Sequence, residues 1–187
     1  MARAGLTPER LTLAAADLAD GIGFANVTVS ALARHFGVKD ASLYSHIRNA
    51  RDLHSRVAVL ALAELADRVA AALAGRAGKD ALVAFAHAYR DYAREHPGRY
   101  AATLFPLDPE TAAASAAGRH AELTRAILRG YALAEPDQTD AVRLLHSTFH
   151  GYASLEAAGA FRPPRTADAS WGRALDALDA TLRNWPA

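Results

Sequence analysis

The chain has 187 residues, 51% of them hydrophobic, and a formal net charge of +1. This length and composition suit a folded protein with a sizeable core and exclude an intrinsically disordered one. The sequence has no cysteine, which excludes disulfides, thiolate zinc sites and cysteine nucleophiles. It also lacks a signal-like N-terminal segment and an uncharged run of about 18 residues, so we expect a cytoplasmic protein without a membrane partner.

Alanine is abundant and runs of β-branched residues are rare, which predicts an all-α fold. The first helix follows Thr7 and ends in the Gly21–Phe24 run. A second helix runs from Thr28 to Gly37, and a third begins near Lys39.

Six further helices complete a predicted set of nine. The long fourth helix separates a small N-terminal domain, residues 1–50, from a larger helical domain, residues 51–187. Glycine, proline and capping residues set the limits of these six helices, at about residues 50–74, 80–95, 99–104, 108–131, 135–159 and 168–184.

The segment from Thr28 to Asp52 has the layout of a helix-turn-helix reader of DNA. Ala33 supplies a small residue where two helices cross, and Gly37 tolerates a turn of positive φ. Outward side chains of the third helix suit the major groove, and flanking ones suit phosphates. An ordinary three-helix core with a glycine turn is the alternative that spacing alone leaves open.

The stretch GFANVTVSALARHFGVKDASLYSHIRNARDL resembles the N-terminal DNA-binding domain of TetR-family transcriptional regulators, and the likeness covers about residues 7–60. Two positions depart from the family pattern: Ile47 replaces an aromatic residue, and Ala50 replaces a lysine that meets a phosphate. Arg48 or Arg51 is expected to serve in place of that lysine. The residue pattern and the resemblance together give the candidate DNA-binding residues Thr28, Lys39, Ala41, Ser42, Tyr44, Ser45, His46, Arg48, Asn49 and Arg51.

The resemblance implies that the C-terminal helices form a homodimer and hold a small, largely apolar effector. A His-Gly pair at His150 also resembles one C-terminal subtype of the family. Candidate dimer contacts are Ala153, Ala157, Trp171, Leu175, Leu178 and Leu182, although this stripe could instead pack inside one chain. Candidate effector contacts are Phe85, His87, Tyr89, Tyr92, Phe105, His146, Phe149 and His150, although each could instead be an ordinary core residue.

The expected function is a TetR-type DNA-binding regulator, a repressor that a small molecule releases from a palindromic DNA operator. The alternative is a helical ligand-binding or scaffold protein whose head is impaired in DNA binding, as the Ala50 departure would allow. His146 and His150 have a spacing that can ligate a metal, but pocket or core roles are favoured. No cofactor and no enzymatic activity are expected, because there is no glycine-rich phosphate loop and no nucleophile with a recognisable helper.

Overall fold

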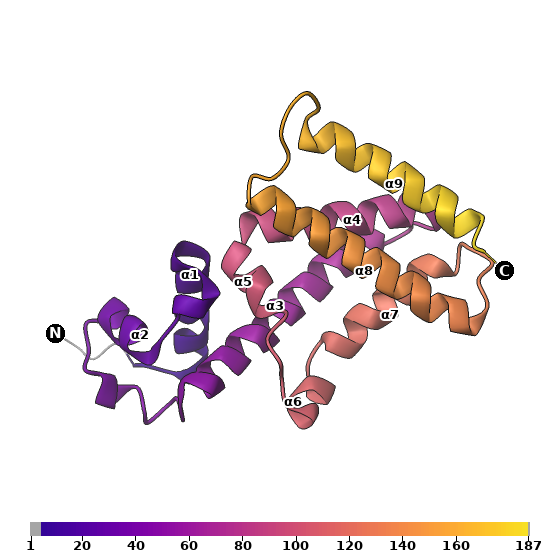
Figure 1. Cartoon of the computed structure of the whole chain (residues 1–187). Coiled ribbons are helices and arrows are strands. Elements are labelled where there is room, and N and C mark those ends of the chain that lie inside the picture. Colours follow the sequence, from indigo (N-terminus) through magenta and orange to yellow (C-terminus); the bar gives the residue numbers. More distant parts are fainter. Residues whose placement is uncertain (1–4, 187) are drawn as a thin grey trace. The chain divides into compact units, whose positions relative to one another are not determined.

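The computed structural model describes residues 5–186, and these residues form α-helices and short 3-10 segments without a β-strand (Figure 1). The predicted all-α fold is therefore confirmed. Within the described part of the chain, no helix is long and apolar enough to cross a membrane. The elements are α1 (Pro8–Ile22), η1 (Phe24–Asn26), α2 (Val29–Phe36), η2 (Asp40–Ser42), α3 (Ala50–Leu73), α4 (Gly78–Glu95), α5 (Pro97–Ala102), α6 (Pro109–Ala114), α7 (Ala117–Leu128), α8 (Glu135–Ala157) and α9 (Ala167–Arg183).

Residues 5–186 contain nine α-helices, the number predicted, but two of the predicted helices are wrong. The expected third helix is only the 3-10 segment η2 followed by hydrogen-bonded turns. The helix expected over residues 108–131 is divided into α6 and α7 at Ser115. The Ser115 hydroxyl donates to the carbonyl of Ala112 at 2.8 Å and accepts from the amide of Ala117 at 3.2 Å. These bonds offer the backbone an alternative to the helical pattern.

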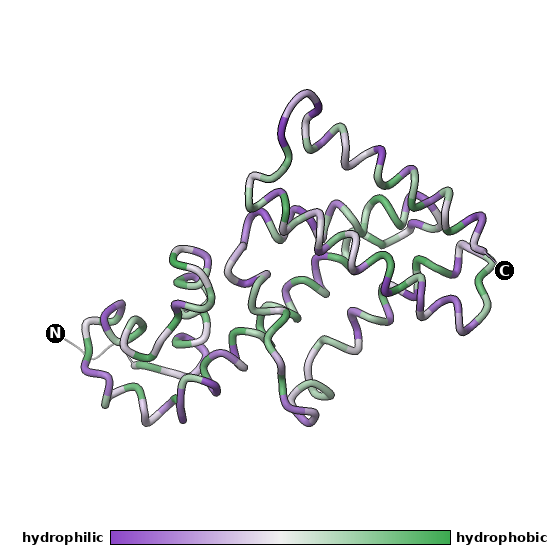
Figure 2. Tube along the Cα trace, viewed as in Figure 1, coloured by the Kyte–Doolittle hydropathy of each residue, from purple (hydrophilic) through white to green (hydrophobic). Residues whose placement is uncertain are grey.

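The helices form two compact units, each continuous in space but not in sequence. The first unit comprises the chain up to Glu64 together with Glu95–Ala117, and the second comprises Leu65–Arg94 with Gly118–Ala187. The first unit thus adds the start of α3, α5 and α6 to the predicted domain 1–50. The outer ends of the predicted domains, residues 1–4 and 187, lie outside the described residues. Figure 2 shows hydrophobic and hydrophilic residues alternating along the helices, as amphipathic packing requires.

In the first unit, α5 packs directly on α1. A Cβ atom on Gly98 would lie 2.0 Å from the carbonyl carbon and oxygen of Ala19, so only glycine allows this approach. The Asp20 carboxylate accepts from the amide of Arg99 at 2.9 Å and lies 3.1 Å from the Nδ1 atom of His96. The start of α5 is therefore fixed against α1 by both close backbone contact and polar bonds.

In the second unit, Arg90 joins α4 to both α8 and α9. Its side chain is only 3% exposed, yet it donates to the Glu156 carboxylate at 2.7 and 2.5 Å and lies 2.7 Å from Asp168. The guanidinium also lies 5.5 Å from the ring centroids of Tyr152 and Trp171. A buried charge needs such partners, so this cluster fixes three helices to one another.

Candidate nucleic-acid interface

The supporting helix α2 is capped at both ends. The Thr28 hydroxyl accepts from the amide of Ala31 at 3.0 Å. At the other end Gly37 has φ 65° and ψ 32°, confirming the predicted positive-φ turn. The amide of Val38 donates to Ala33 and that of Gly37 donates to Arg34, which is the pattern of a Schellman motif. The turn after α2 is therefore specified by its own backbone bonds.

The segment after this turn presents a row of polar side chains to solvent. The Ser30 hydroxyl donates to the Asp40 carboxylate and ties α2 to the start of η2. Leu43 and Ile47 are buried at 0% and 1% exposure and anchor the segment to the core of the first unit. Between them Tyr44 stays 56% exposed. The segment is thus held from beneath while its outer face is accessible.

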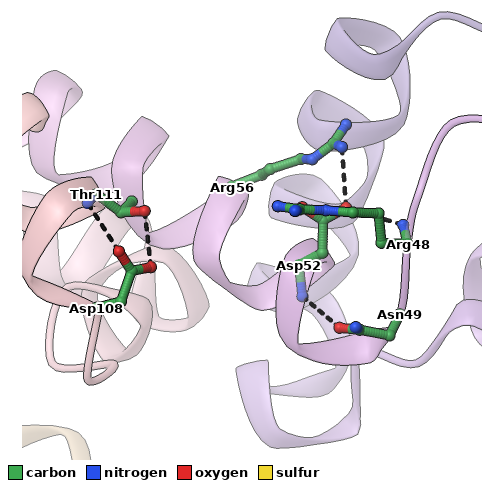
Figure 3. A network of polar contacts seen from close by, with 6 residues as sticks. All are labelled: Arg48, Asn49, Asp52, Arg56, Asp108 and Thr111. Atoms are coloured by element: carbon green, nitrogen blue, oxygen red, sulfur yellow. Dashed lines mark hydrogen bonds and ion pairs between the residues drawn. The ribbon is translucent and has the colours of Figure 1, made fainter.

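The Arg48–Asn49 loop is closed by a reciprocal cap at the start of α3 (Figure 3). The Asn49 side-chain oxygen accepts from the amide of Asp52 at 2.9 Å, and the Asp52 carboxylate accepts from the amide of Arg48 at 3.0 Å. The same carboxylate accepts from the guanidinium groups of Arg48 at 3.2 Å and Arg56 at 2.9 Å. Burial opposes its charged form, but these bonds outweigh burial and lower the pKa of Asp52 below its ordinary value.

The two arginines that flank Ala50 have different environments. The Arg48 side chain is 85% exposed, and its guanidinium contacts only Asp52 among the described residues. Arg51 is exposed too, but it donates to the carbonyl of Pro106 at 3.0 Å and lies 5.4 Å from the ring centroid of Phe105. Ala50 is exposed at the first position of α3. Arg48 is therefore the better placed of the two to reach a phosphate near Ala50.

The structure brings the ten candidate DNA-binding residues together on the first unit. Nine of them are exposed, and His46 is half-buried. The side chain of Thr28 also acts as the cap of α2, and Ser45 donates its hydroxyl to the carbonyl of Ser42 at 3.1 Å. Ile47, where the family has an aromatic residue, fills the core at 1% exposure. The departure at Ile47 is therefore accommodated by packing.

Four of the predicted effector contacts meet in the second unit. Phe85, Phe149, Tyr89 and His146 form a cluster in which the ring centroids of Phe85 and Phe149 lie 5.8 Å apart. Sequence reasoning missed a fifth member, His120, whose ring lies 5.2 Å from His146 and 5.6 Å from Phe85. His120 lies four, seven and eight positions before Thr124, Ile127 and Leu128, and this helical spacing is the signal that could have placed it on the buried face of α7.

Burial disfavours the charged form of both histidines of this cluster. Burial, with repulsion from the charge that His146 carries when protonated as a second cause, lowers the pKa of His120 from 6.5 to about 4, and burial also lowers the pKa of His146. The Thr124 hydroxyl lies 3.0 Å from the carbonyl of His120 and 2.8 Å from the Nε2 atom of His146, so it can bond to both. The Nδ1 atom of His120 is buried without a partner among the described residues.

The other four predicted effector contacts have differing environments. Phe105 belongs to the first unit, where its ring packs edge-on against Phe24 and His54. His87 is exposed on α4, whereas Tyr92 is buried at 2% exposure. The half-buried His150 has its Nε2 atom 3.4 Å from the Ser154 hydroxyl. Within the described residues, no three metal-ligating side chains come together.

The predicted dimer stripe is buried by the chain itself. Ala153, Trp171, Leu175, Leu178 and Leu182 have exposures between 1% and 7%, and only Ala157 is exposed. This is the within-chain packing that the sequence left open as an alternative. Contact with a second copy through α8 and α9 would have to use their exposed faces, where Leu155 is 50% exposed.

Comparisons with known proteins agree with this architecture. A family model described as the tetracyclin repressor-like C-terminal domain matches residues 82–178. The HTH-type transcriptional regulator YobS of Bacillus subtilis is 33% identical over 159 residues, which cover 85% of this chain and 83% of that protein. The HTH-type regulator Rv0681 of Mycobacterium tuberculosis is 36% identical over 160 residues, covering 83% and 72%. The solved structure of the TetR-family regulator PfmR of Thermus thermophilus has a TM-score of 0.66 and 27% identity, covering 96% and 97%.

The two matched regulators cover most of both units, and the family model covers much of the second unit. Their class is that of helix-turn-helix transcriptional regulators. The chain belongs to the TetR family and is a DNA-binding transcriptional regulator.

Proposed function

We propose that the protein is a homodimeric repressor that binds a palindromic operator through residues 39–49 of each copy. The observation that carries this proposal is the exposed polar row held between the Gly37 turn and the Asn49 cap. Lys39, Ser42, Ser45 and His46 would meet base edges, and small Ala41 would permit close approach to the groove. Tyr44, Asn49 and Thr28 would meet the sugar-phosphate backbone.

Arg48 takes the phosphate-contact role of the lysine that Ala50 replaces. Its side chain is 85% exposed and is oriented by Asp52 rather than buried by it. A guanidinium can bind a phosphate through two parallel hydrogen bonds while keeping one bond to a carboxylate. Arg51, which already contacts Pro106 and Phe105, makes at most a secondary contact.

The proposal includes dimerisation because one short reading segment contacts few bases. Two copies related by a two-fold axis would read half-sites about 34–36 Å apart, as helix-turn-helix dimers do. We further propose that a small, largely apolar effector binds near the Phe85, Phe149 and His120 cluster of the second unit and releases the operator. The unpartnered Nδ1 atom of His120 supports a polar anchor in these apolar surroundings.

A gel-shift series on DNA flanking the protein's own gene tests the proposal. The native chain should form a sequence-specific complex, and the double variant Lys39→Ala with Arg48→Ala should lose it while staying folded. Arg76→Ala is the matched control, because it removes an exposed arginine between α3 and α4, outside both the predicted DNA-binding residues and the predicted dimer helices. Native protein that shows no sequence preference even at low salt would refute operator binding.

A further inference from the structure

The first unit contains an open groove of about 980 Å³, and only its edge at Arg48, Asn49 and Arg51 belongs to the proposed DNA interface. Its walls are α1, the Arg48–Asn49 loop, the first half of α3 and the start of α6. All of these segments belong to the same compact unit. The volume is within the range of small-molecule sites, which span about 300–1,000 Å³.

The wall formed by α3 changes from polar to apolar along its length. Arg51, Asp52 and Arg56 line its first two turns, and Val59, Leu60 and Ala63 line the next two. From residue 51 to residue 63 the helix rises about 18 Å. The facing wall of α1 adds Leu13, a leucine that is 48% exposed. A ligand along this wall would therefore meet charge at one end and apolar surface at the other.

The charged end of the groove offers guanidinium N–H donors to an anion. Arg48, Arg51 and Arg56 each have five N–H donors, and their contacts with described residues use few of them. The carboxylate of Asp52 lies between Arg48 and Arg56 and leaves that triad with a net charge of +1 (Figure 3).

Two other carboxylates line the groove and set a limit on this charge. Asp108 is committed to the cap of α6, where it accepts from the amide of Thr111 at 2.9 Å and from its hydroxyl at 2.7 Å. Glu9 lies in the first turn of α1, and hydrogen bonding to the backbone and Thr7 lowers its pKa, so it is ionised as well. Together with Asp52, these two acids equal the three arginines in number, so the groove has no net charge. Neither Asp108 nor Glu9 has a hydrogen bond to a guanidinium, so N–H donors of Arg48 and Arg51 stay available.

We propose that this groove binds a long-chain carboxylate, with its anionic group at the three arginines and its chain along Val59, Leu60 and Leu13. The site is distinct from the aromatic cluster of the second unit. The effect of this ligand on DNA binding rests on the proposed function, because Arg48 and Arg51 would contact both the ligand and the operator phosphates. Ligand and DNA would then exclude one another directly, without a conformational change.

Calorimetric titration of the full chain with dodecanoate, below its micelle concentration and without DNA, tests the site. Dodecanoate should bind, and affinity should fall about two- to fourfold for each methylene removed toward hexanoate. Arg56→Gln should weaken binding at least tenfold, whereas Arg173→Gln should leave it unchanged. Leu13→Gln, a change at an exposed position, should reduce the dependence on chain length even if Arg56→Gln folds poorly.

Three results would overturn the assignment. Equal affinity for dodecyltrimethylammonium would show that the arginines select no charge. Unchanged binding by folded Arg56→Gln and Leu13→Gln would place the carboxylate elsewhere. Binding only to phosphatidylglycerol vesicles, and not to monomeric dodecanoate, would assign the groove to a membrane surface instead.

The competition is tested separately on the operator. Dodecanoate should raise the operator concentration needed for half-saturation of the native chain, and the effect should vanish in Arg56→Gln. Dodecanoate that binds without changing operator affinity would refute the shared arginines but leave operator binding intact. Loss of operator binding in the Lys39 and Arg48 double variant is an independent result, so failure of the groove and failure of the proposed function are distinguishable.

Discussion

Lowering the pH from 7 to 5 should destabilise the protein through one buried side chain, His120. His120 is only 9% exposed, and burial lowers the pKa of its imidazole from 6.5 to about 4. Between these two values the unfolded chain binds more protons than the folded chain. The stability that His120 contributes is therefore complete above pH 6.5 and declines as the pH falls toward 4.

The magnitude follows from the size of the pKa change. At about 1.36 kcal/mol per pKa unit, the full loss below pH 4 is about 3 kcal/mol, and the loss at pH 5 is about 2 kcal/mol. That is a large part of a typical unfolding free energy of about 5–15 kcal/mol. His146, whose pKa burial also lowers, should add a loss of the same sign.

Urea unfolding at pH 7 and pH 5 measures this effect, and the pKa itself can be followed by NMR of the imidazole carbon-bound proton. The native chain should lose about 2 kcal/mol more than His120→Gln over this interval. His87→Gln, which changes an exposed histidine of the same unit, should retain the native loss. Identical pH dependence of the native chain and His120→Gln would refute the buried neutral state of this histidine.

Two further substitutions test the packing of each unit. Gly98→Ala should destabilise the first unit by about 1–3 kcal/mol, because the added Cβ would lie 2.0 Å from the backbone of α1. Gly118→Ala, at an open helical position, should be neutral or slightly stabilising, and thermal unfolding distinguishes the two variants. Arg90→Gln should cost about 3–5 kcal/mol by leaving the Glu156 carboxylate unpaired, whereas Arg173→Gln should cost less than about 0.5 kcal/mol; equal midpoints in denaturant would contradict the role of the buried arginine.

The head of the molecule was predictable because its determinants are local. Thr28, Gly37 and Asn49 act through bonds to residues within five positions, and each occupies the role expected from its type. The sequence did not show that a 3-10 segment and turns, rather than an α-helix, follow Gly37. The stretch after Gly37 is too short for helical periodicity to distinguish a helix from a 3-10 turn.

The predicted effector and dimer contacts were less predictable because their surroundings depend on contacts between distant parts of the chain. Phe105 is an aromatic residue of the kind that lines ligand pockets. In the structure it follows α5 and packs beside Phe24 in the first unit. The local sequence shows His120 only as a polar residue on an Ala-rich helix. Its burial depends on packing against His146 of α8, which is distant in sequence. Trp171 and its neighbours fit either a dimer face or a core, and amphipathic spacing cannot tell these apart.

Selection of bound sites from random duplex DNA by the native chain tests operator reading most directly. Enriched sequences should form a palindrome whose half-site centres lie about 10–10.5 base pairs apart or a multiple of that, and Lys39→Ala with Arg48→Ala should abolish the enrichment. Recovery of no preferred sequence by the native chain, or of the same palindrome by the double variant, would contradict the assignment of residues 39–49 as the reading segment.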